Sequence, residues 1–254
     1  MPWKKARICL FPLTLALSMG LVIFPRSPFS LPAQAADTNT NNSNNKLGGK
    51  WNGYEPPDLG TPGRLEGGGT RGICITDSSD QLTALLPETS AALTVSEYPS
   101  FLVYVPKNYA EKEVKFTLVK QNGDGKDEQV YDTKLTTPSQ SGIIQVSLPK
   151  NAKVQPLEIG KNYYWSFSVI CNHDKREQDR VVTGWVKRIE NKITAKSADE
   201  RLRAYQNQAL WYDTLDTLVE KRNQQPDNPK IVAEWENVLR EVKLDRIINK
   251  PLLP

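Results

Sequence analysis

Few residues in this sequence have the types and spacing that catalysis needs. The one histidine, His173, lies in a polar run between Asn172 and Asp179. A histidine can act as general base for a serine or cysteine nucleophile, but no Gly-x-Ser-x-Gly elbow occurs. Ser147 and Lys150 have the spacing found in penicillin-recognising enzymes, yet the Ser-Asp-Asn and Lys-Thr-Gly motifs of those enzymes are missing. We therefore predict that the protein is not an enzyme.

Two further patterns resemble ligand sites. The glycine cluster Gly67–Gly72 could cradle a phosphate through its backbone N–H groups, but no Gly-Lys-Ser/Thr sequence follows it. A calcium loop centred on Gly125 would place Lys120 and Tyr131 where carboxylate ligands are needed. A hairpin turn explains Asn122–Asp127 better, since Asn, Asp and Gly tolerate positive φ angles. We expect no cofactor and no metal.

The N-terminal segment predicts export. A basic stretch precedes the apolar run Ile8–Phe24, and Ala33-Gln34-Ala35 supplies small residues where a signal peptidase cleaves. We expect a signal peptide over residues 1–35, cleavage after Ala35, and no stable membrane insertion afterwards. The alternative is an uncleaved anchor, because the 17 apolar residues are close to the shortest span of a bilayer.

Cleavage changes the charge of the chain. The removed segment holds four basic residues and no acid, so the basic residues fall from 33 to 29 and equal the 29 acids. A neutral mature chain gives no support for a nucleic-acid partner. We expect a protein partner in the periplasm or cell envelope instead.

Two cysteines remain after cleavage, Cys74 and Cys171. Because the compartment is predicted to be oxidising, we favour a disulfide between them. It would close a loop of about 97 residues and add roughly 4 to 5 kcal/mol in the chain-entropy model. Two buried free thiols, or a bridge to another chain, are the alternatives.

Residues 36–55 are polar enough to predict a disordered linker. Residues 56–193 are predicted to form a β domain with an irregular Gly/Pro-rich N-terminal arm. Short strand-like runs that end in turn residues favour an immunoglobulin-like antiparallel β-sandwich. The runs are Gly72–Thr76, Leu93–Ser96, Phe101–Val105, Val114–Lys120, Glu128–Leu135, Gly142–Leu148, Tyr163–Cys171 and Arg180–Ile189.

Leu157, Gly160 and Tyr163 have the spacing of the tyrosine corner of such domains, in which the hydroxyl hydrogen-bonds to the upstream backbone. A plain hairpin that begins with an aromatic residue is the alternative. From Tyr163 onwards, large apolar residues alternate with polar ones, which predicts one buried face.

Residues 194–247 predict a helical unit. Ser197-Ala-Asp-Glu200 is a capping box, and Pro226–Pro229 ends one helix and begins another. The register from Ala198 to Pro226 resembles a tetratricopeptide-like helical hairpin, more closely in its later part than at its start, and it would split the first helix near Asn207. One hairpin is too small to stand alone, so it must dock on the sandwich, a second copy or a partner. The candidate interaction surface is formed by Tyr205, Trp211, Tyr212 and Trp235.

Several sequence blocks carry a family resemblance. They are Thr61-Pro-Gly-Arg64, Gly67-Gly-Gly-Thr-Arg71 with Cys74, Pro99-Ser-Phe-Leu-Val-Tyr-Val-Pro106, Tyr163-Tyr-Trp-Ser-Phe-Ser-Val-Ile-Cys171, Gly184-Trp-Val-Lys-Arg188 and Leu210-Trp-Tyr-Asp-Thr-Leu215. Together they are similar to the cyanobacterial domain-of-unknown-function family 928, over about residues 56–245. The resemblance implies exported envelope proteins with no assigned activity, cofactor or catalytic residue. Ala209 stands where the family pattern has a glycine.

Our leading functional prediction is an exported, non-enzymatic module whose sandwich, held by Cys74 and Cys171, presents the helical unit to an envelope protein. The alternative is an envelope glycan-binding or glycan-cleaving domain. In that case Tyr164, Trp185 and Trp211 would stack on sugars, and two of the acids would flank a glycosidic bond.

Overall fold

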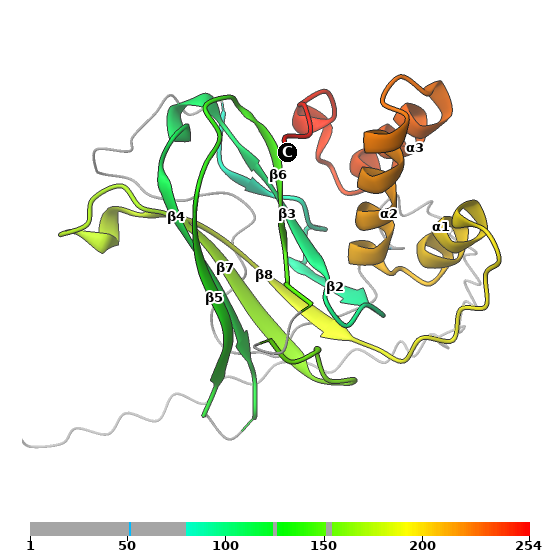
Figure 1. The fold of residues 1–254 in the computed structure, drawn as a ribbon, viewed down its shortest axis with the longest axis horizontal. Helices are drawn as coiled ribbons and strands as arrows, with labels where there is room; N and C mark the ends of the chain where they lie inside the picture. Colours follow the sequence, from blue (N-terminus) through cyan, green and yellow to red (C-terminus); the bar gives the residue numbers. More distant parts are fainter. Residues whose placement is uncertain (1–50, 52–79, 124–125, 151–153) are drawn as a thin grey trace, which may run out of the picture. The chain divides into compact units, whose positions relative to one another are not determined.

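The computed structural model describes Trp51 and residues 80–123, 126–150 and 154–254, which all belong to one compact unit, residues 45–254. This part of the chain is mainly β, with two sheets followed by three C-terminal helices (Figure 1). The strands are β1 (Thr83–Ala84), β2 (Ala91–Thr94), β3 (Ser100–Val105), β4 (Glu113–Lys120), β5 (Glu128–Thr136), β6 (Gly142–Ser147), β7 (Asn162–Val169) and β8 (Arg180–Arg188). The helices are α1 (Ala198–Asn207), α2 (Trp211–Gln224) and α3 (Pro229–Glu241).

Seven of the eight predicted strand runs overlap an observed strand. The eighth, Gly72–Thr76, lies outside the described residues, as do the predicted signal peptide, Cys74 and, apart from Trp51, the linker and arm. The prediction missed β1, because two residues are too few to show a period. Within the described residues, no helix has the length and apolar character needed to cross a membrane.

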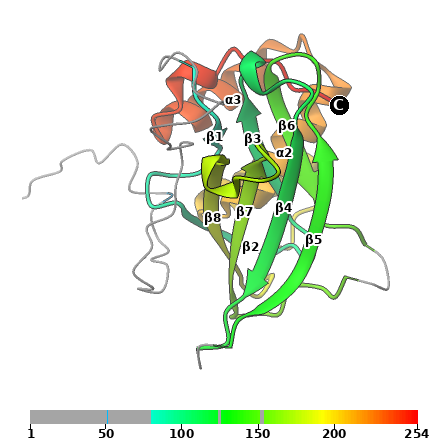
Figure 2. The same cartoon turned by 90° about the vertical axis from the view of Figure 1, so that its left-hand side faces the viewer.

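The larger sheet has the strand order β2-β8-β7-β4-β5, and the smaller one β1-β3-β6. Figure 2 shows β8, β7, β4 and β5 side by side. All neighbours are antiparallel except β2 and β8, which run parallel with Ala91 opposite Trp185. The expectation of a purely antiparallel arrangement was therefore wrong at this edge. No hairpin joins β2 to β8, so chain connectivity does not fix their relative direction.

The two sheets share one core, which is built on alternate residues of β7. Tyr163, Trp165, Phe167 and Val169 are at most 2% exposed, so the period-two prediction is confirmed. Phe101 of the smaller sheet reaches across to Trp165, with ring centroids 5.3 Å apart.

Gly184 of β8 makes room for that indole. It lies opposite Trp165 in the antiparallel pair β7–β8. A Cβ at this position would stand 2.2 Å from Leu86 Cδ1 and 2.9 Å from the Trp165 ring. A side chain here would therefore displace the centre of the core.

The predicted tyrosine corner forms its hydrogen bond. The Tyr163 hydroxyl accepts from the backbone N–H of Glu158 at 2.8 Å. Gly160 has a φ of +80°, which a glycine adopts without strain, and Leu157 is buried beside the turn. The corner thereby fixes the start of β7.

The helical unit begins as predicted but contains three helices rather than one hairpin. Ser197 caps α1 by accepting from the N–H of Glu200 at 3.1 Å, and the Glu200 carboxylate accepts from the N–H of Lys196 at 2.8 Å. The predicted break near Asn207 is present, and Ala209 between α1 and α2 has a φ of +55°. The missing glycine thus did not prevent a tight turn, although alanine is strained in this conformation.

The segment after α3 returns to the smaller sheet. Ile143 of β6 donates its N–H to Pro251 O at 2.7 Å and accepts from the N–H of Leu253 at 2.8 Å. Gly142 allows this approach, since a Cβ there would lie 2.5 Å from Leu253 Cγ. The outer edge of β6 is therefore covered by residues 251–253.

Candidate functional site

The strongest constellation of polar side chains lies where α2 meets the two sheets. Three consecutive residues at the start of α2, Trp211, Tyr212 and Asp213, are no more than 6% exposed. Each makes a hydrogen bond to the β domain. The Trp211 indole, for instance, donates to Leu85 O at 2.8 Å. We call this contact region the α2 joint.

Tyr212 occupies the centre of the α2 joint. Its hydroxyl donates to Trp185 O at 2.9 Å and accepts from Trp165 Nε1 at 2.9 Å. The ring also meets Phe101 edge-on, with centroids 5.5 Å apart. One side chain of the helix thus completes both the hydrogen bonding and the packing of the β-domain core.

Two carboxylates extend the α2 joint. Asp213 Oδ2 accepts from the N–H of Val95 at 3.0 Å. Asp216 accepts from the N–H of Ser100 at 3.3 Å and from Gln145 Nε2 at 3.0 Å. These acceptors hold α2 against the segment between β2 and β3 and against β6.

Burial makes both carboxyl groups harder to ionise. Removal from water raises the pKa of Asp213 to about 6, although the hydrogen bond from Val95 opposes the change. Burial likewise raises the pKa of Asp216 to about 6, against the hydrogen bonds from Ser100 and Gln145. Groups that titrate near pH 6 are candidates for proton transfer as well as for structure.

A polar cavity of about 370 Å³ borders the two carboxylates. It is lined by Val95, Ser96, Lys150, Asn191, Arg201, Tyr205, Asp213, Asp216, Thr217 and Glu220. Both carboxylates belong to one helix and are three residues apart, whereas glycosidase carboxyl groups flank the scissile bond. Both oxygens of Asp216 already accept N–H groups. The two carboxylates are therefore better placed to hold α2 against the β domain than to act on a substrate.

The candidate interaction surface requires correction. Trp211 is 0% exposed, Tyr212 2% and Trp235 1%, so these three residues cannot form an outer surface. Trp235 donates to Ile248 O at 3.2 Å and carries the guanidinium of Arg222 over its ring. Trp211 and Tyr212 instead pack on the chain's own β domain, and Trp235 packs inside the helical unit. Only Tyr205 is half-buried, beside the cavity next to Asp213.

A further aromatic residue joins this core from the N-terminal part of the chain. Trp51 is 1% exposed and meets Trp211 edge-on, with centroids 4.9 Å apart. Its indole donates to the Glu241 carboxylate at 2.6 Å. Sequence reasoning missed Trp51, because an isolated aromatic in a Gly-rich segment shows no period. It also missed Asp216, although an acid four residues after Tyr212 on an apolar face was a usable signal.

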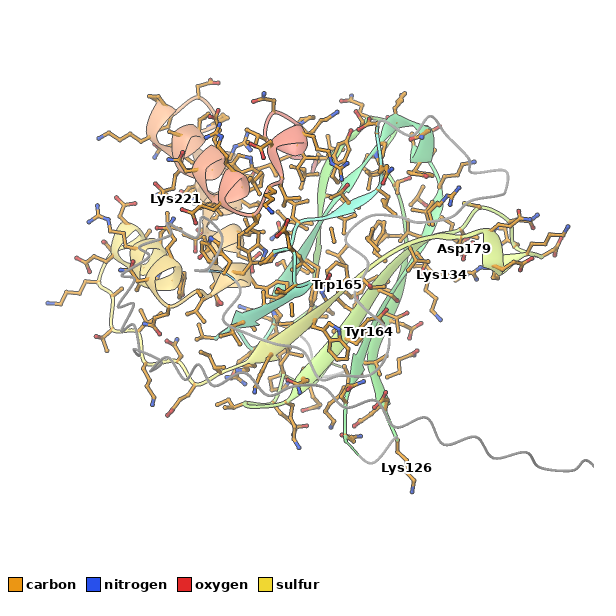
Figure 3. All side chains as sticks on the ribbon, turned by 180° about the vertical axis from the view of Figure 1, so that it is seen from behind. Lys126, Lys134, Tyr164, Trp165, Asp179 and Lys221 are labelled. Carbon is orange, nitrogen blue, oxygen red and sulfur yellow. The ribbon has the colours of Figure 1, made fainter. Side chains whose placement is uncertain are left out.

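The aromatics predicted for sugar stacking are also mostly covered. Tyr164, labelled in Figure 3, and its cross-strand partner Trp185 lie on the face of the larger sheet opposite to Trp165, with ring centroids 5.1 Å apart. Trp185 is only 3% exposed and Tyr164 is half-buried. A flat aromatic platform for a sugar is therefore not offered by these residues.

On the other side of α2, a groove of about 500 Å³ runs between the three helices. Its lining is formed by Ser197, Ala198, Asp199, Leu202, Arg203, Leu218, Lys221, Gln224, Gln225, Asn228, Lys230, Ile231 and Glu234. Lys221 and Asp199 form an ion pair across it. We call it the helical groove; unlike the α2 joint, it is accessible.

The remaining predicted sites do not come together. Among the described residues, no group of three His, Cys, Asp or Glu side chains could hold a metal ion. His173 is exposed in the turn between β7 and β8. Cys171 lies just beyond β7, while Cys74 is outside the described residues, so their pairing stays a prediction.

Fold and site together define a mainly β protein of two sheets, to which a C-terminal helical unit is fastened by buried side chains. The model of the family described as Domain of Unknown Function (DUF928) matches residues 66–252. The chain belongs to this family, as the sequence blocks predicted. Among curated proteins, none matches the chain.

Proposed function

We propose that this protein is an exported, non-enzymatic module of the cell envelope that binds a protein partner through its helical unit. The export signal at residues 1–35 supports the location. The observation that carries the proposal is the division of the helical unit into two sides. The aromatic side is fixed in the α2 joint, and the opposite side presents the helical groove.

The β domain is proposed to be an immunoglobulin-like sandwich. Its strand order, with β2 added beside β8, β7, β4 and β5, and its tyrosine corner at Tyr163 support this assignment. A Cys74–Cys171 disulfide would tie the arm to the end of β7. A rigid sandwich of this kind is a suitable platform for a binding unit.

The helical unit is proposed to use tetratricopeptide-like packing between α1 and α2, in a register that ends at Pro226, and α3 follows as a further helix. Asn228 caps α3 by accepting from the N–H of Lys230 at 3.1 Å, and Pro229 begins the helix. Such helix pairs bind partners through their concave side, which here is the helical groove.

The glycan alternative has weaker support. Trp185 and Trp211 are covered, Tyr164 is half-buried, and the best carboxylate pair, Asp213 and Asp216, accepts N–H groups of the protein itself. A protein-binding role requires neither feature.

Site-specific photo-crosslinking in cells tests the proposal. A photoreactive residue would replace Asn237, which is exposed on α3 away from the helical groove, or Gln224, which lines that groove. Exposed Lys175, in the turn between β7 and β8, serves as control. Discrete crosslinked species from the helical unit alone are expected. Crosslinks from Lys175 only, or from no position, would contradict the proposal.

A further inference from the structure

The helical groove has an apolar floor. Leu202, Leu218 and Ile231, one from each helix, line it and are at most 6% exposed. A small aliphatic side chain placed on them would extend the contact without changing the fold. The floor is narrow, because polar residues of all three helices surround it.

Side-chain bridges hold the groove open at a fixed width. Lys221 of α2 pairs with Asp199 of α1, and Gln206 of α1 donates to Glu234 of α3 (Figure 3 labels Lys221). Each bridge joins two helices, so the positions of the walls are set before any ligand arrives. A preorganised groove binds a flexible segment with less loss of entropy.

Two cations of the groove have no acceptor of their own. In the part of the chain that the structure describes, neither the guanidinium of Arg203 nor the ammonium of Lys230 has a hydrogen-bond or ion-pair partner. The pKa of the Asp199 carboxyl group is lowered, chiefly by the hydrogen bond from Lys221 and to a smaller extent by the charges of Arg203 and Lys230. The groove is therefore a favourable environment for a carboxylate.

We propose that the helical groove binds an acidic peptide segment of a protein partner, with an aliphatic side chain on Leu202, Leu218 and Ile231 and flanking carboxylates on Arg203 and Lys230. The inference rests on the proposed function and names the chemistry of the partner. Charge complementarity favours an acidic occupant, because the cations Arg203, Lys221 and Lys230 outnumber the acids Asp199 and Glu234 in the lining of the groove. The apolar floor favours a peptide over a phosphate or sulfate polymer, which has no aliphatic side chain to place there.

Fluorescence anisotropy with labelled peptides provides the test. The probes are 12-residue peptides in which one leucine is flanked by glutamates at spacings of one to four residues, and the protein is the chain from residue 36 onwards. Matched probes carry glutamine for glutamate, or serine for leucine. We expect at least one glutamate–leucine probe to bind at least tenfold more tightly than both matched probes.

Charge reversal locates the site. Arg203→Glu combined with Lys230→Glu should weaken binding at least tenfold and create binding to the lysine version of the same peptide. Lys161→Glu combined with Lys175→Glu, at exposed positions outside the groove, should leave the affinity within twofold. Circular dichroism checks that both variants are folded.

The inference is overturned if no acidic probe binds, if charge reversal leaves the affinity unchanged, or if polyphosphate binds the same groove as tightly. Crosslinking separates this failure from failure of the proposed function. If Asn237 gives crosslinks but no acidic probe binds, the proposal of a protein partner on the helical unit stands and the proposal of an acidic peptide in the groove is rejected. If there are no crosslinks and no probe binds, both proposals are rejected.

Discussion

The Trp165 indole donates to the Tyr212 hydroxyl at 2.9 Å, so a strand of the larger sheet and a helix share one buried hydrogen bond between residues 47 positions apart. The same hydroxyl donates onward to Trp185 O. These two hydrogen bonds make α2 part of the β-domain core. Replacing Tyr212 by phenylalanine removes the hydroxyl group and tests their contribution to stability.

Tyr212→Phe should lower the free energy of unfolding by about 1 to 3 kcal/mol, because the Trp165 N–H and the Trp185 carbonyl lose their partner in a buried site. Urea denaturation measures the change. Tyr131→Phe, which removes a half-buried hydroxyl on β5, serves as control and should stay within about 0.5 kcal/mol. Equal effects of the two changes would contradict the role given to the α2 joint.

The carboxylates of the α2 joint predict how stability depends on pH. Burial raises the pKa of Asp213 and of Asp216 from 3.8 to about 6, so the folded state binds more protons than the unfolded state between these values. Their contribution to stability is full below pH 3.8 and is lost as the pH rises through about 6. A shift of two units corresponds to about 3 kcal/mol per group as an upper figure.

Asp213→Asn keeps an oxygen acceptor for the Val95 N–H and removes the charge. The variant should match the wild type near pH 4 and be more stable near pH 7.5, by about 1 to 3 kcal/mol. Thermal unfolding over this range measures the difference. Asp132→Asn, at an exposed position of β5, should leave the pH profile unchanged. Parallel profiles for wild type and Asp213→Asn would argue against the raised pKa.

Ala209 offers a stabilising substitution. Its φ of +55° lies in the left-handed region, which glycine adopts without the clash of a Cβ. Ala209→Gly relieves this strain, but glycine also loses more conformational entropy on folding than alanine does. The net effect should be a stabilisation of about 0.5 to 1 kcal/mol. Ala204→Gly, inside α1, should instead destabilise by about 1 kcal/mol. If both changes destabilise equally, the turn is not strained.

Gly184→Ala should destabilise by about 1 to 3 kcal/mol, because the new Cβ meets Leu86 and Trp165. A double-mutant cycle with Leu86→Ala tests the cause. Removing the Leu86 side chain opens space for the Cβ, so the two changes should be less than additive. Additive effects would show that the Leu86 contact is not responsible.

Local patterns predicted most of the strands and the capped start of α1, because period, turn residues and caps are short-range features. The tyrosine corner was also accessible, since Glu158 and Tyr163 are close in sequence. The parallel pairing of β2 with β8 places Ala91 opposite Trp185. These residues are far apart in the sequence, so no short-range pattern predicts their pairing. The sequence singled out Trp211 and Tyr212 as aromatic residues of the helical unit, but it could not reveal that the chain's own β domain covers them.

The pairing of Ile143 with Leu252 joins residues 109 positions apart, so the cost of closing a long loop must be met before this contact forms. Until it forms, the outer edge of β6 has no partner, and its free N–H and C=O groups can pair with another chain. A folding molecule is therefore exposed to edge-to-edge association after its sheets have formed and before residues 251–253 dock.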